Sequence, residues 1–172
     1  ELYTVGHEEG LRALRAGVAH GTLYGGCLSI LASMLGTPWE AQTEGKLLFL
    51  EDTGAKPYQI DRMLCQLKHA GKLDNVCGIV FGEMLDCKSP GAANNLLEDV
   101  ILSVLQDFNG PIAIGLRSGH VSRQNVTPTF GREAELLVSE NAQLPLPEPG
   151  VACEPQRRRP LPSSVSAGPR CP

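Results

Sequence analysis

Two positions in this 172-residue chain place ionisable side chains where an α/β fold usually holds its chemistry. Glu51 and Asp52 directly follow the apolar run KLLFL, and His120 follows the apolar run GPIAIGL. Loops that follow strand ends commonly carry functional residues in such folds. A histidine beside a carboxylate forms the base and orienter half of a nucleophile relay, whose third member is a hydroxyl or thiol. The alternative is that His120 is an ordinary loop residue and that the two acids are solvated.

Strands and helices alternate before and between these positions. Short apolar segments bounded by glycine or proline predict buried strands over 46–50, 75–82 and 110–116. Amphipathic spacing predicts helices over 57–71 and 94–110. A shorter helix is expected over 27–35, and further strands over 18–24 and 134–138. The alternation implies an α/β domain with crossover connections.

The ends of the two longer helices carry recognisable signals. Pro57 suits the first turn of one helix and Gly71 suits its C-terminal cap. Asn95 and Glu98 are spaced like a capping box at the start of the other. These signals fix the helix boundaries more firmly than hydrophobic spacing alone.

Composition argues against several functional classes. Hydrophobic residues make up 42% of the chain and charged residues 20%, as in an average globular domain. The net charge of -4 gives no broad positive surface, so nucleic acid is not an expected partner. No apolar run is long enough to cross a bilayer, so no membrane partner is expected. The first ten residues show no signal-peptide pattern.

Metal and nucleotide sites are not indicated either. The six cysteines occur singly, without the CxxC pairs of zinc or redox sites. No glycine-rich phosphate-binding motif is present. We therefore expect neither a metal nor another cofactor. The segment 143–172 is rich in proline, serine and glycine without a hydrophobic period, which predicts a disordered tail.

Four motifs occur in an order and spacing that resemble the LD-carboxypeptidase family. They are GTLYGGCLSILASMLGTPWE, GKLLFLEDTGAKPYQIDRMLCQLKHAGKL, GIVFGEMLDC and GLRSGHVSRQNVTPTFG, and together they cover most of 17–138. The combination of FLED, PYQIDRML and GxxSGH is the specific part. Two positions depart from the family pattern, since Cys27 stands where asparagine is usual and Gln59 stands where arginine is usual.

The resemblance implies a fold and a division into parts. We expect the C-terminal domain of an LD-carboxypeptidase over 17–142, with a mixed β-sheet or partial barrel of the swivelling β/β/α type and flanking helices. Residues 1–16 would be the remnant of an interdomain linker. In that family a Ser-His-Glu triad is divided between two domains, so Glu51 would be the orienting carboxylate and His120 the general base. The serine would come from an N-terminal domain that this chain does not contain.

The same resemblance implies a function. The whole protein would hydrolyse the bond between the L-centre and the terminal D-alanine of murein tetrapeptide in the bacterial cytoplasm, as a homodimer without cofactors. The isolated chain is expected to be inactive, because it lacks the nucleophile and the oxyanion-hole amides. Three alternatives stay open: a non-catalytic binding or regulatory module, a microcin C immunity-type amide hydrolase, and a thiol hydrolase using Cys65 or Cys87.

Overall fold

Four parallel strands form the centre of the sheet in the computed structural model, which describes residues 2–6, 10–88 and 96–147. They lie in chain order, and each is joined to the next through one helix. The strands are β3 (Gly17–Cys27), β4 (Lys46–Glu51), β5 (Gly78–Gly82) and β6 (Ile112–Leu116). The helices are α1 (Leu28–Ser33), α2 (Pro57–His69) and α3 (Leu96–Val104). The expected α/β domain with crossover connections is confirmed.

Four antiparallel strands extend this centre on both sides. They are β1 (Leu2–Val5), β2 (Arg12–Arg15), β7 (Glu133–Val138) and β8 (Ala142–Pro147), and the sheet order is β1-β8-β7-β3-β4-β5-β6-β2. β1 and β2 lie at opposite ends of this order, although only 6–11 separate them in sequence. A flat sheet would place its outer strands roughly 34 Å apart, farther than the about 25 Å that this segment can span. The sheet must therefore curl.

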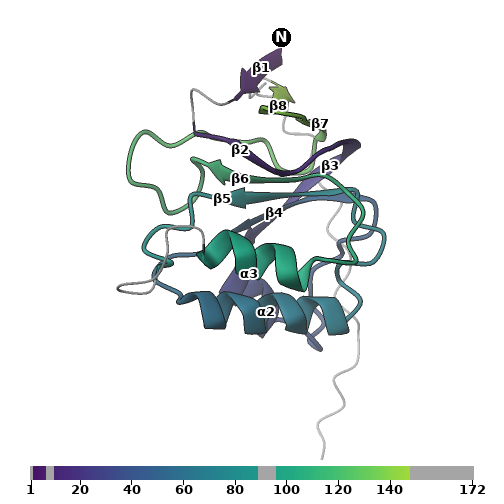
Figure 1. Ribbon diagram of the computed structural model, residues 1–172. Coiled ribbons are helices and arrows are strands. Elements are labelled where there is room, and N and C mark those ends of the chain that lie inside the picture. The colour runs from purple at the N-terminus through teal and green to yellow at the C-terminus, as the bar shows by residue number, and fades with distance from the viewer. Residues whose placement is uncertain (1, 7–9, 89–95, 148–172) are drawn as a thin grey trace, which may run out of the picture.

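Within the described residues, the curled sheet does not close into a barrel. β1 has a ladder only with β8, and β2 has a ladder only with β6. The expected mixed sheet with flanking helices is observed, and its curl gives it the form of an open, partial barrel. Figure 1 shows α2 and α3 side by side beneath the sheet, with β1 and β8 on the far side from these helices.

Both faces of the central strands are buried. Leu48 and Leu50 of β4 point into the hydrophobic cluster between the sheet and the helices, together with residues such as Ile60 and Leu64 of α2. Leu47 and Phe49 point the other way, into a second cluster that includes residues of β7 and β8. Alternating side chains of one strand therefore serve two cores, and β4 is held in place from both sides. This strand ends at Glu51.

Helix α2 begins and ends as the sequence predicts. Pro57 is its first residue, and the backbone N–H of Lys56 donates to Oε1 of Gln59 at 2.8 Å. Gln59, the second departure from the family pattern, thus caps the helix start. The capping box expected at Asn95 and Glu98 lies partly outside the described residues.

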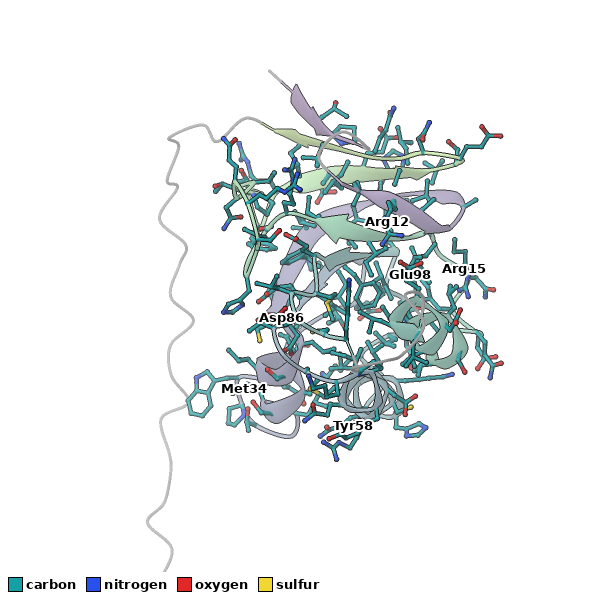
Figure 2. The ribbon with its side chains drawn as sticks, turned by 60° about the vertical axis from the view of Figure 1, so that its left-hand side comes forward. Arg12, Arg15, Met34, Tyr58, Asp86 and Glu98 are labelled. Atoms are coloured by element: carbon teal, nitrogen blue, oxygen red, sulfur yellow. The ribbon has the colours of Figure 1, made fainter. Side chains whose placement is uncertain are left out.

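Within 1–16, the segment predicted as a linker remnant, the described residues of β2 are joined to the domain by side-chain contacts. Arg12 of β2 forms an ion pair with Glu98 of α3 at 2.6 Å, and the two side chains lie together in Figure 2. Arg15 donates to the backbone carbonyls of Leu105 and Phe108, just beyond α3. β2 is thus part of the domain, since an ion pair and hydrogen bonds join it to α3 and to the residues that follow α3.

The predicted tail boundary also needs correction, because 143–147 belong to β8. Leu144 and Leu146 are buried in the second core, and Ala142 precedes them with the same spacing of two. Prolines between these residues hid the alternation, since proline lowers strand propensity and donates no backbone hydrogen bond. The remainder of the predicted tail, 148–172, lies outside the described residues. None of the helices in the described part of the chain has the length and apolar character needed to cross a membrane.

Candidate active site

The candidate site lies at the carboxyl edge of the parallel strands. Glu51 is the last residue of β4, and His120 lies in the loop that follows β6. Because β4, β5 and β6 are parallel neighbours, the loops after them emerge at the same edge of the sheet. Topology therefore brings the two sequence-predicted residues to one place.

Glu51 and His120 are in direct contact. Oε2 of Glu51 lies 3.0 Å from Nδ1 of His120 and also accepts the backbone N–H of His120 at 3.1 Å. The carboxylate side chain is only 7% exposed, whereas the imidazole is 56% exposed. An ionised carboxylate can only accept, so a neutral imidazole in this contact carries its hydrogen on Nδ1 and keeps the lone pair on Nε2. The contact expected between these two side chains is present, and the structure adds that the carboxylate is buried.

Two glycines make room for the buried carboxylate. A Cβ at Gly119 would lie 2.6 Å from Cδ of Glu51, and Gly119 has a φ of +86°. A Cβ at Gly82, the last residue of β5, would lie 2.6 Å from Cβ of Glu51. Side chains are not tolerated at such distances, so both positions must be glycine for Glu51 to sit here. Gly119, the glycine before His120, is therefore required because any side chain there would clash with Glu51.

Asp52, the second acid of the pair, has a different role. Its Oδ2 accepts the backbone N–H of Ser29 in the first turn of α1 at 2.9 Å, and its Oδ1 accepts the N–H of Thr53 at 2.8 Å. The thiol of Cys27 lies 3.8 Å from the same Oδ2. Cys27 precedes α1 but makes no side-chain cap, so Asp52 caps that helix from the neighbouring strand. The two acids thus face different partners.

Sequence reasoning did not single out Glu83, which follows β5 at the same edge. Both of its carboxylate oxygens accept hydrogen bonds from Ser122, one from the backbone N–H at 3.1 Å and one from the hydroxyl. Ser122 lies two residues after His120. The available signal was the position of Glu83, because an acid directly after a buried strand is the same pattern that drew attention to Glu51.

Neither Cys65 nor Cys87, the two cysteines considered as nucleophiles, suits that role. Cys87 is fully buried, and burial raises the pKa of its thiol to about 11, with nearby carboxylates adding to the effect. Its sulfur donates to the carbonyls of Asp52 and Leu85, each at 3.6 Å. Cys65 lies on α2 and packs against the helix-side core. A nucleophilic thiol needs a lowered pKa and access to substrate, so the thiol alternative loses its support. In the described part of the chain, no three potential ligands are grouped as a metal site would require.

Residues 20–136 match the sequence family described as the LD-carboxypeptidase C-terminal domain. The chain belongs to the LD-carboxypeptidase family. A probable murein peptide carboxypeptidase of Bacillus subtilis is 42% identical over 131 residues, which are 76% of this chain and 41% of that protein. The murein tetrapeptide carboxypeptidase of Pseudomonas aeruginosa is 32% identical over 67% of this chain and 38% of its own length.

Two solved structures share the fold of this chain. Muramoyltetrapeptide carboxypeptidase from Oxalobacter formigenes superposes with a TM-score of 0.68 at 27% identity, over 84% of this chain and 50% of that one. The microcin C7 self-immunity protein superposes with a TM-score of 0.67 at 23% identity, over 81% of this chain and 41% of its own, and shares the fold. This chain spans less than half the length of the curated relatives it matches.

Proposed function

We propose that this chain is the half of a serine LD-carboxypeptidase that supplies the general base, His120, and the orienting carboxylate, Glu51. The serine would come from a preceding N-terminal domain. The relatives' names support a carboxypeptidase that acts on murein peptides, and the one observation that carries the mechanism is the Glu51–His120 contact. A nucleophile relay needs a carboxylate that orients the imidazole and a ring that is open to the serine. Here the buried Glu51 carboxylate contacts Nδ1 of His120, and the ring is exposed.

The chemistry would be acyl transfer to serine followed by hydrolysis. Nε2 of His120 would take the serine proton as the hydroxyl attacks the carbonyl of the scissile amide, and would then return it to the departing D-alanine amine. Water would repeat the sequence to release the shortened peptide. Glu51 would hold the ring and stabilise its protonated form without itself taking the proton. General base catalysis of this kind contributes roughly a hundredfold to ten-thousandfold.

The substrate would be murein tetrapeptide, cut between its L-centre and the terminal D-alanine. We place the reaction in peptidoglycan recycling in the bacterial cytoplasm, with the protein acting as a homodimer and without cofactors. Two rivals lead to different outcomes. A microcin C immunity-type hydrolase would cleave a peptidyl-nucleotide amide instead, and a non-catalytic module would cleave neither substrate.

One assay separates these possibilities. The chain alone and the protein expressed with the sequence encoded upstream of Glu1 are each incubated with an LD-tetrapeptide, and released D-alanine is quantified. We expect release only from the longer protein. Release by the isolated chain would contradict the proposed origin of the serine. If neither protein releases D-alanine, the same incubation with a peptidyl-nucleotide amide separates the two rivals: cleavage would favour the microcin C immunity-type hydrolase, and no cleavage would favour the non-catalytic module.

A further inference from the structure

The loop that follows β5 lies between the two loops of the candidate site. β5 is flanked by β4, which ends at Glu51, and by β6, which leads to His120. The loop covers 83–88 and begins with Glu83, directly after the last residue of the strand. A segment in this position can fix the separation between Glu51 and His120.

Contacts on one side join this loop to the residues after Glu51. Leu85 forms a β-bridge with Thr53, and its carbonyl accepts the backbone N–H of Gly54 at 2.8 Å. The buried thiol of Cys87 donates to the carbonyl of Asp52 at 3.6 Å. Asp52 and Gly54 are therefore hydrogen-bonded to 83–88, and Thr53 between them is the bridge partner of Leu85.

On the other side, Glu83 joins this loop to the segment 117–126. Its carboxylate accepts two hydrogen bonds from Ser122, one from the backbone N–H at 3.1 Å and one from the hydroxyl. Hydrogen bonds to a charged acceptor are about twice as strong as neutral ones. The 117–126 segment has internal bonds as well, from Asn125 to the carbonyl of Gly119 and from Val126 to the carbonyl of Arg117. Glu83 thus binds a loop that is already stabilised by hydrogen bonds between its own residues.

Backbone conformation marks the same loop as specialised. Met84 and Asp86 have φ values of 53° and 56°, which are unfavourable for residues with a side chain. Asp86 projects at this edge of the molecule in Figure 2, while Met84 is 3% exposed and packs in the helix-side core. Such conformations persist where packing enforces them, and they cluster at functional sites.

We propose that Glu83 is a positioning residue for His120, which it holds in register with Glu51 by its two-point bond to Ser122. The bond lies two residues beyond His120 in the sequence, so it fixes the loop at a second point, distinct from the Glu51 contact. Its catalytic meaning rests on the proposed function, but the geometric effect does not. Loss of the carboxylate would let the loop move and would loosen the hydrogen bonds between His120 and Glu51.

The test uses the purified 172-residue chain and needs no activity. Glu83→Ala is compared with Glu133→Ala, a matched control in which a carboxylate bonded to the Thr22 hydroxyl at 2.6 Å is removed elsewhere on the sheet. Amide hydrogen exchange reports the His120 N–H, and the ring ¹⁵N shifts report which nitrogen carries the hydrogen. We expect His120 exchange to quicken about tenfold or more in Glu83→Ala, the size expected for charged hydrogen bonds, with no change in Glu133→Ala.

Unchanged exchange and unchanged ring shifts in Glu83→Ala would overturn the proposal, as would equal changes in both variants. If Glu83→Ala fails to fold, Glu83→Gln and Ser122→Ala serve instead, since each leaves part of the bond and should give an intermediate loss. In the longer protein, Glu83→Ala should lower kcat with little effect on KM. If that protein proves inactive without any substitution, the proposed function fails while the exchange result still decides the role of Glu83.

Discussion

One oxygen of Glu51 holds His120 at two points, the ring Nδ1 at 3.0 Å and the backbone N–H at 3.1 Å. The ring contact selects the tautomer, and the backbone contact fixes where the loop stands relative to β4. The two residues are 69 positions apart in sequence, so only the parallel order of β4, β5 and β6 brings them together. One buried carboxylate thus contacts both the ring and the backbone of the base.

His120→Ala in the longer protein should remove the general base. We expect D-alanine release to fall by at least the roughly hundredfold to ten-thousandfold that such catalysis supplies. His20→Ala is the matched control, because His20 also contacts a glutamate, Glu135 at 3.3 Å, but on an exposed part of β3. Circular dichroism checks that both variants fold. Normal turnover in His120→Ala would rule out the proposed base.

Glu51→Gln should damage catalysis while leaving the shape of the site nearly intact. The glutamine amide can donate to Nδ1, which moves the ring hydrogen to Nε2 and removes the acceptor that serine needs. We expect kcat of the longer protein to fall roughly a thousandfold to ten-thousandfold. Ring ¹⁵N shifts of His120 should show the altered tautomer in the isolated chain. An unaltered tautomer combined with full activity would exclude the orienting role.

Much of the fold follows from local patterns because its central strands are short, apolar and bounded by glycine. The predicted strand segment 46–50 lies in β4, the predicted segment 110–116 contains β6, and the predicted helix 57–71 contains α2. β1 and β2 escaped prediction because each has only four residues, too few for a periodic signal, and because their partners are distant in sequence. Their stability comes from pairing with β8 and β6.

The sequence predicts the two main residues of the site but not the neighbouring residues that hold them in position. Position after a strand suggested Glu51 and His120, and the family resemblance assigned their roles. Nothing local indicates that Asp52 would turn toward α1 while Glu51 turns toward His120, because that depends on where neighbouring loops run. Glu83 was missed for the same reason, since its partner Ser122 lies 39 residues away.

Asp52→Ala should lower stability through α1. The substitution removes the acceptor of the Ser29 N–H, which leaves the helix start uncapped. We expect the free energy of unfolding to fall by about 0.5–2 kcal/mol, as for other helix caps. Asp61→Ala, at an exposed position of α2, should change it by less than about 0.5 kcal/mol. Urea unfolding of both variants measures the difference, and equal midpoints would contradict the capping role.

Cys87 should make stability fall at alkaline pH. Burial raises the pKa of its thiol to about 11, so the folded chain keeps a proton that the unfolded chain loses near its usual pKa of about 8.5. The stabilisation is complete below that pH and is lost as the pH rises through the folded pKa. Between the two values the free energy of unfolding should fall by up to about 1.4 kcal/mol per pH unit. Urea unfolding at several pH values should show a shallower decline in Cys87→Ala; parallel declines would argue against a buried, protonated thiol.

Gly119 and Gly131 offer a pair that separates backbone strain from steric conflict. Their φ values are +86° and +80°, so alanine costs about 1–2 kcal/mol of strain at either position. At Gly131 a Cβ meets nothing within 4 Å, whereas at Gly119 it would lie 2.6 Å from Cδ of Glu51. Gly131→Ala should therefore lower the free energy of unfolding and leave the His120 ring ¹⁵N shifts unchanged. Gly119→Ala should lower it further and alter those shifts, because the new methyl group forces the loop away from the carboxylate. Identical behaviour of the two variants would mean that Glu51 can move aside and that the close approach of Gly119 is not what sets the site.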